Sequence, residues 1–338
     1  MHHLIPPTRR CFSLVAASLF LSAALAAHAA GKGFTADQSA TGVVIKYDGQ
    51  PFATYVIGDA NKSYLFPVYG PTGKAMTRAY PMQKVEGEQY DHPHHRGICF
   101  GHEGIAGSDT WAEEATFAGN AKYAQRLEHL GSQKHREYKK IEATGDSAVI
   151  SVVIDYLDKS GKKQLKEERT FIFRASGDTR SIDMNQVFTA TEGPAKFEDK
   201  KDAGLSIRVP TEMCVEIEKG KKGTGHIINS ESLTDAEAWG KRAKWCDYYG
   251  TVGGEALGVA MLNHPTSFRF PTPWHVRTYG LFTANPFGTK SLDKNAADGA
   301  YELKKGESTI LRHRFIFHKG DEKSAKIAEA FEAYAKEQ

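Results

Sequence analysis

Alternating apolar and polar positions recur along the chain and predict a succession of β-strands. Positions 43–47 (VVIKY) and 52–57 (FATYVI) form two such runs, and Asp48 and Gly49 lie between them. An Asp-Gly pair supplies the positive φ angles of a tight hairpin turn. Similar runs, separated by polar turns, follow at 148–157, 164–174, 181–189 and 312–317. Successive hairpins of this kind indicate an antiparallel sheet.

Helical periodicity is confined to the end of the chain. Ile327, Phe331 and Tyr334 repeat at i, i+4 and i+7, and Asp321 precedes them as the expected N-cap. Neither the G-x-G-x-x-G nor the G-x-x-x-x-G-K-[ST] phosphate-binding pattern occurs, which argues against a nucleotide-binding α/β fold. We therefore predict a mainly β fold, a large antiparallel β-sandwich with a C-terminal helix.

The first residues have the features of an export signal. Arg9 and Arg10 precede an apolar stretch at 12–26, and a small-x-small cleavage pattern follows at 27–29. The stretch of roughly 15 residues is shorter than the ~20 that a membrane-spanning helix needs. We expect residues 1–29 to be a signal peptide of the Sec or twin-arginine type, and the protein to be periplasmic or secreted without membrane insertion.

Beyond the signal, the sequence predicts one domain at 30–338, because no Pro/Ser-rich linker, repeat or low-complexity stretch divides it. The chain has 44 basic and 41 acidic residues, and without Arg9 and Arg10 it is close to neutral. Both charge types are interspersed, so nucleic acid is not an expected partner. Cys99, Cys214 and Cys246 remain after the signal, which fits three free thiols or one bridge between the last two.

The densest polar cluster is the segment 91–102, DHPHHRGICFGH, which holds four of the 14 histidines. Histidine titrates near neutral pH and binds metals in its neutral form, so His94, His95 and His102 are candidate catalytic residues. Arg96 is a candidate substrate-binding residue, and Pro93 favours an extended conformation for the residue before it. The alternative is a rigid turn in which the histidines bond to the backbone.

The second cluster is the segment 271–288, PTPWHVRTYGLFTANPFG. Strand alternation would place His275, Arg277 and Tyr279 on one face, which combines a proton carrier, a fixed cation and a hydroxyl. Arg277 could hold a carboxylate or stabilise a developing oxyanion. Asn285 is a further candidate for binding. The structural alternative is an internal ion pair beside a hydrogen-bonded histidine.

Two segments between these clusters add candidate ligands. Arg208 ends a probable strand, and Glu198, Asp199 and Asp202 lie shortly before it as candidate acids in a charged loop. Trp239 begins an aromatic stretch that could stack on a sugar ring or pack in the core. No G-x-S-x-G, H-E-x-x-H or paired C-x-x-C pattern occurs, so no nucleophile is assigned and a divalent metal stays an open alternative.

Taken in order, five segments resemble the PmoA-like family of exported bacterial proteins, also called methane oxygenase PmoA. They are YLFPVYGPTGKAMTR, DHPHHRGICFGH, KDAGLSIRVP, the stretch 229–250 with NSES, LTD and AWGKRAKWCDYYG, and PTPWHVRTYGLFTANPFG. The similarity runs from about Tyr64 to Phe317. Its label implies a membrane-embedded monooxygenase subunit with several apolar spans, which this sequence lacks. The family's β architecture is similar to the supersandwich of galactose mutarotases, which use histidines and a carboxylate for proton transfer at a sugar ring.

The resemblance and the residues together lead to an exported carbohydrate-active protein that performs histidine-based acid/base chemistry, as an epimerase, lyase or glycoside hydrolase. His95 or His102 would exchange protons with a small-molecule or oligosaccharide substrate, and His275 would be the partner acid or base. Arg208 and Arg277 would orient its oxygens. A noncatalytic carbohydrate-binding module and a His-ligated metal oxidoreductase are the alternatives.

Overall fold

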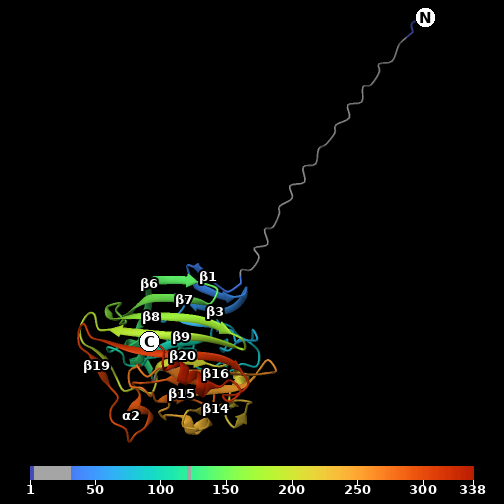
Figure 1. Ribbon diagram of the computed structural model, residues 1–338. Coiled ribbons are helices and arrows are strands. Elements are labelled where there is room, and N and C mark those ends of the chain that lie inside the picture. Colours follow the sequence, from blue (N-terminus) through green and yellow to red (C-terminus); the bar gives the residue numbers. More distant parts are fainter. Residues whose placement is uncertain (4–31, 120–122) are drawn as a thin grey trace. The chain divides into compact units, whose positions relative to one another are not determined.

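Two large antiparallel sheets dominate the computed structural model, which describes residues 1–3, 32–119 and 123–338 (Figure 1). The predicted signal peptide falls almost wholly outside these residues. In the first sheet the strand order is β1 (Phe34–Ser39), β2 (Gly42–Tyr47), β3 (Gln50–Val56), β4 (Tyr64–Val68), β5 (Ile98–His102), β11 (Ala203–Arg208), β18 (Leu281–Ala284) and β17 (Trp274–Val276).

The second sheet faces the viewer in Figure 1. Its order is β14 (His226–Asn229), β15 (Trp245–Val252), β16 (Glu255–Asn263), β20 (Ser308–Lys319), β9 (Thr179–Thr189), β8 (Lys163–Ser176), β7 (Ser147–Leu157) and β6 (Ser132–Ala143). Two small antiparallel pairs accompany the large sheets: β10 (Ala195–Phe197) with β19 (Tyr301–Leu303), and β12 (Glu216–Glu218) with β13 (Lys221–Lys222).

Apolar side chains from the facing sides of the two sheets meet in a shared core. Phe52 of the first sheet packs edge-on against Phe173 of the second, with 5.7 Å between ring centroids. Further along, the rings of Phe100 and Phe188 pack at a tilt, with 4.9 Å between their centroids. Such face-to-face packing of antiparallel sheets is a β-sandwich, so the predicted fold class is confirmed.

The predicted hairpins form at the turn residues that the sequence indicated. Strands β2 and β3 pair across Asp48 and Gly49, whose φ angles are 49° and 75°. Strands β7, β8 and β9 then follow as consecutive hairpins, each paired with the next. Strand β20 returns beside β9 and completes the middle of the second sheet.

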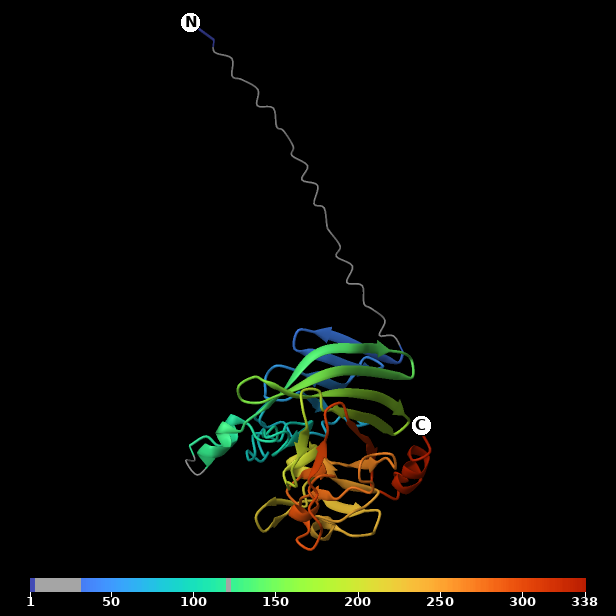
Figure 2. The ribbon, with the colours of Figure 1, turned by 90° about the vertical axis from the view of Figure 1, so that its left-hand side faces the viewer.

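Helices are short in the described chain: α1 (Ala124–Glu128), α2 (Thr289–Leu292) and α3 (Ile327–Tyr334). In α3, the predicted Ile327, Phe331 and Tyr334 are buried and pack with Trp245 and Leu262 of the second sheet. Asp321 is not the N-cap, because α3 begins only after Lys326, whose φ is 54°. Figure 2 shows α3 at one side of the molecule and α1 at the opposite side.

Residues 31–338 form one compact unit. In the described part of that unit, Cys99, Cys214 and Cys246 are buried free thiols, so the alternative of a bridge between the last two does not hold. None of the described helices is both long enough and apolar enough to cross a membrane.

Strands β5, β11, β18 and β17 lie side by side in the first sheet. Register places Cys99, Ser206, Thr283 and His275 in one row across them. Because side chains alternate along a strand, this row lies on the face away from the core that holds Phe100 and its neighbours. Of the predicted site residues, His275 and Arg208 lie on this outer face of the first sheet.

Candidate functional site

A pocket of about 260 Å³ brings the two histidine-rich segments together. His92, His94 and His95 of the first segment line it, and Tyr279 of the second lies among them. Other polar groups on its wall are Arg126, Lys201 and Asp202. Four segments from distant parts of the sequence therefore supply its polar lining.

Asp91 fixes the orientation of the His92 ring. The Asp91 Oδ2 atom lies 2.7 Å from His92 Nδ1, and Asp91 Oδ1 accepts hydrogen bonds from the buried guanidiniums of Arg78 and Arg208. A carboxylate only accepts, so His92 Nδ1 carries a proton, and in a ring with a single proton Nε2 is then an acceptor. Burial alone would raise the pKa of Asp91, but His92 and the two arginines outweigh it and lower that pKa.

His95 has the opposite tautomer. The Arg208 Nη1 atom donates to His95 Nδ1 across 3.0 Å. A guanidinium has only donors, so Nδ1 must accept and the ring proton sits on Nε2. Burial, together with the positive charges of His94 and Arg208, lowers the pKa of His95 well below its ordinary value. His95 is therefore neutral at pH 7 and presents an N–H donor.

The two histidine rings lie parallel beside a tyrosine. The His92 ring is stacked on His95 with centroids 4.8 Å apart and on Tyr279 with centroids 5.4 Å apart. Burial raises the pKa of Tyr279, so its hydroxyl stays protonated. The stack thus places an acceptor, His92 Nε2, next to two donors, the His95 N–H and the Tyr279 hydroxyl. Such an arrangement can move a proton and stabilise an oxyanion.

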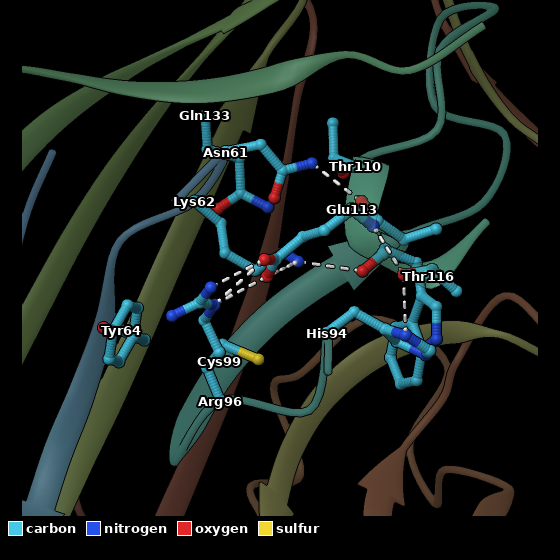
Figure 3. A network of polar contacts seen from close by, with 12 residues as sticks. Asn61, Lys62, Tyr64, His94, Arg96, Cys99, Thr110, Glu113, Thr116 and Gln133 are labelled. Atoms are coloured by element: carbon cyan, nitrogen blue, oxygen red, sulfur yellow. Dashed lines mark hydrogen bonds and ion pairs between the residues drawn. The ribbon is translucent and has the colours of Figure 1, made fainter. Parts of the chain in front are cut away.

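His94 is held by the wall of the pocket (Figure 3). Its Nδ1 atom lies 3.0 Å from the Thr116 hydroxyl, which also accepts the Glu113 backbone N–H at 3.0 Å. The Glu113 carboxylate binds Lys62 at 3.1 Å and Arg96 at 2.8 Å. This buried network fixes the wall segment 111–116, and it occupies Arg96, which the sequence suggested as a substrate-binding residue but which does not line the pocket.

His102 lies away from the pocket. The side chain is fully buried, and the ring packs edge-on against Phe197 and Phe287. Its Nδ1 atom accepts the Gly104 backbone N–H at 2.9 Å. As the last residue of β5 it shares the core-facing side with Phe100, so strand alternation separates it from the other histidines.

His275 and Asn285 support the loop that carries Lys201 and Asp202. His275 Nδ1 donates to the Lys201 carbonyl at 2.9 Å, and the Asn285 amide donates to the carbonyls of Lys200 and Lys201 at 2.9 and 3.0 Å. Burial lowers the pKa of His275 to about 4. Neither residue lines the pocket, although both lie behind its wall.

The strand that contains His275 ends sooner than alternation predicts. Strand β17 stops at Val276, and Arg277 to Gly280 form a turn closed by the Gly280 N–H on the Arg277 carbonyl at 3.0 Å. Gly280 has a φ of 97°, a conformation that favours glycine. The turn sends Tyr279 into the pocket, while Arg277 lies with Trp239 at a second hollow of about 250 Å³.

Sequence reasoning missed His92 and Arg126. The signal for His92 was the acidic residue directly before it, since an Asp-His pair can orient a ring. The expectation of an extended residue before Pro93 is wrong, because the φ of His92 is 46°. This left-handed conformation accompanies the side-chain bond to Asp91.

A family of unknown function matches the chain. The family model described as "Family of unknown function (DUF6807)" covers residues 42–332. The chain is a member of DUF6807. No curated protein matches it. This match names DUF6807 and not the PmoA-like family, so the resemblance to the PmoA-like family stays a prediction.

Solved structures resemble this DUF6807 protein at low identity. The GH36 α-galactosidase AgaA from Geobacillus stearothermophilus has a TM-score of 0.41 at 9% identity over 85% of this chain and 41% of its own, so the present chain spans about two fifths of it. A galactose mutarotase-like protein from Lactobacillus casei has a TM-score of 0.40 at 6% identity, over 85% of this chain and 100% of its own. A galactose mutarotase related enzyme from Lactobacillus acidophilus scores 0.34 at 10% identity, over 85% and 98%. Likeness at this level carries no argument about activity.

The tautomer of His95 in this DUF6807 protein does not suit metal binding. Among the residues that the structure describes, no three His, Cys, Asp or Glu side chains are grouped to hold a metal ion. Binding through His95 Nε2 would move the ring proton to Nδ1, where it would point at the Arg208 guanidinium. The sequence alternative of a His-ligated metal therefore does not fit His95.

Buried neutral histidines predict a protein that loses stability in acid. Burial lowers the pKa of His102 to about 3 from an ordinary 6.5. Between these values the unfolded chain binds more protons, so this stability is present above pH 6.5 and is lost as the pH falls toward 3. His102→Leu should reduce the slope of unfolding free energy against pH by up to about 1.4 kcal/mol per pH unit. Urea denaturation at several pH values between 7.5 and 5 measures this slope.

The matched control for this prediction is His129→Leu, because His129 is exposed. Its slope should equal that of the unaltered chain. Equal slopes for His102→Leu and the unaltered chain would show that the buried ring does not cause the acid sensitivity.

Proposed function

We propose that the pocket binds a sugar and that His92 and His95 carry out acid/base chemistry on it. The observation that carries this proposal is the pair of stacked rings with opposite tautomers, one fixed by Asp91 and the other by Arg208. His92 Nε2 is placed to take a proton, and the His95 N–H is placed to donate to an oxygen nearby. Such complementary roles are set by environment rather than by residue type.

The reaction best supported is proton abstraction from a carbon next to a carbonyl, leading to epimerisation or β-elimination. The C–H proton would pass to His92 Nε2, and the resulting imidazolium would be stabilised by Asp91. The electron pair would move to the carbonyl oxygen, which His95 and Tyr279 face as donors. Delivery of a proton from water to the opposite face, with release of the abstracted proton from His92 to water, gives an epimer. Alternatively, the enolate expels a β-oxygen substituent, which takes the proton from the His92 imidazolium and leaves as an alcohol beside an unsaturated sugar.

Glycoside hydrolysis receives less support from the pocket. It ordinarily needs two carboxyl groups, one on each side of the scissile bond. Among the described lining residues, Asp202 supplies the carboxylate, and it is paired with Lys201 at 3.0 Å. Asp91 does not line the pocket, and its two oxygens are taken by His92 and the arginines.

The sugar assignment rests on the lining itself. Trp111 and Phe117 are the aromatic lining residues that could contact the apolar face of a sugar ring, and the histidines, the Tyr279 hydroxyl and Asp202 can bond hydroxyls. The names of the structural neighbours, an α-galactosidase and galactose mutarotase-like proteins, make galactose and its derivatives the first sugars to test. The export signal expected at 1–29 makes the proposed location periplasmic or extracellular.

Deuterium exchange tests the proposal. The protein is incubated in D₂O with aldoses, ketoses and sugar acids, and proton NMR follows loss of individual C–H signals and formation of unsaturated products. Enzyme-dependent exchange at a carbon next to a carbonyl supports the mechanism. Binding without exchange for every sugar would favour the noncatalytic binding module instead, and failure of every sugar to bind would contradict the carbohydrate assignment.

A further inference from the structure

A second hollow adjoins the pocket at the turn between β17 and β18. Its volume is about 250 Å³, and Trp239, Arg277 and Thr278 are among its lining residues. Tyr279, the next residue along, lines the main pocket. Consecutive residues of one turn therefore line the two hollows, and the Arg277 guanidinium lies 5.4 Å from the centroid of the Tyr279 ring.

Arg277 has no acidic partner among the described residues, unlike the arginines around the main pocket. Arg78, Arg96, Arg126 and Arg208 each form an ion pair with a carboxylate. The Arg277 guanidinium instead lies over two aromatic rings, 5.9 Å from the centroid of Trp239 and 5.4 Å from that of Tyr279. Stacking on rings restrains the side chain while its five N–H donors stay unused by any acid.

We infer that Trp239 and Arg277 form a second subsite, which takes the carboxylate of an acidic sugar unit. The inference rests on the proposed function, because the main pocket would hold the neighbouring unit. Trp239 would stack on the sugar ring, and the planar guanidinium would bind the carboxylate with two parallel hydrogen bonds. The substrate class that this describes is an oligosaccharide, or a sugar conjugate, that contains a uronic acid.

The charge of the hollow favours a carboxylate over a phosphate. Arg277 is its single charged lining residue among those described, and the others are Ala236, Trp239, Val276 and Thr278. One positive charge balances the single charge of a carboxylate, whereas a phosphate monoester carries nearly two at neutral pH. Phosphate sites usually gather several cationic or backbone N–H donors.

Calorimetric titration tests the subsite with three probes: digalacturonate, its neutral counterpart galactobiose, and the smaller monosaccharide galactose 6-phosphate. The unaltered protein should bind digalacturonate about tenfold or more tightly than galactobiose, since a charge-assisted pair adds this much affinity. Arg277→Gln should abolish the preference, and Arg277→Lys should retain part of it because the charge remains without the planar fork. Added salt should weaken digalacturonate binding and leave galactobiose binding unchanged.

The control variant is Arg136→Gln, which removes an exposed arginine from β6 in the second sheet. It should keep the preference, and thermal unfolding checks that each variant is folded. Equal affinities for the acidic and neutral disaccharides, an unchanged preference in Arg277→Gln, or tighter binding of the phosphate would each overturn the inference. If galactobiose binds and loses affinity in His92→Gln, the main pocket stands even where the acidic preference fails. If no probe binds, both proposals fail together.

Discussion

Replacing His92 by glutamine is expected to slow deuterium exchange into the substrate at least about a hundredfold, since general base catalysis typically contributes that much or more. Glutamine can still hydrogen-bond Asp91, and it fills much of the space of the ring. It has no group that accepts a proton near neutral pH. The rate of exchange per bound sugar, measured by NMR at saturating sugar, isolates the loss of the base from any loss of affinity.

A matched control for this prediction is His226→Gln, which alters an exposed histidine on β14 of the second sheet. It should leave the exchange rate within about twofold of the unaltered protein. His95→Gln should also slow exchange, because the donor to the developing oxyanion is lost. Exchange at an unchanged rate in His92→Gln would remove His92 from the role of base.

A substitution of His275 is expected to affect proton transfer less than the sequence predicted. His275 was the predicted partner acid or base, but its Nδ1 proton is bonded to the Lys201 carbonyl and its ring does not line the pocket. Its substitution acts on the position of Lys201 and Asp202. We therefore expect it to change sugar affinity more than the rate of proton transfer.

Local pattern was sufficient for the fold. Alternation and turn residues such as Asp48 and Gly49 depend on near neighbours, so they predicted the hairpins and the sandwich that the structure contains. Helix α3 followed from the spacing of its buried residues, although its start did not, because the chain turns at Lys326 before the helix begins.

Local pattern was insufficient for the chemistry of the site. The tautomer of His95 depends on Arg208, which is 113 positions away in sequence. The same alternation that worked for strands extended β17 too far, because Gly280 closes a turn there. Arg96 lies before β5 begins and bonds Glu113, so it is not part of the pocket lining. Long-range polar contacts decided these cases.

The Lys62–Glu113–Arg96 network is an example of long-range polar contacts that contribute strongly to stability. Glu113 pairs with two cations that are almost completely buried, with exposed side-chain fractions of 1% for Lys62 and 14% for Arg96. Burial alone would raise the pKa of Glu113, but Lys62 and Arg96 lower it, so the carboxylate is charged. Lys62 also donates to the Trp111 carbonyl at 2.8 Å.

Glu113→Ala is therefore expected to lower the free energy of unfolding by about 3–5 kcal/mol, because it leaves the Lys62 ammonium buried without a counter-charge. Urea denaturation at pH 7.5 measures the loss, which should appear as a lower midpoint with little change in slope. The control is Glu114→Ala, since Glu114 is the exposed neighbour and should cost less than about 0.5 kcal/mol.

A double variant separates the unpaired charge from the lost packing. Lys62→Met combined with Glu113→Gln removes the ammonium and its carboxylate together while the volumes are nearly kept. Because a buried charge is costly mainly when it is left alone, the double variant should be more stable than Glu113→Ala by about 1 kcal/mol or more. A double variant no more stable than Glu113→Ala would mean that the cost comes from the lost hydrogen bonds of the 111–116 wall, and sugar affinity should then fall in both variants alike.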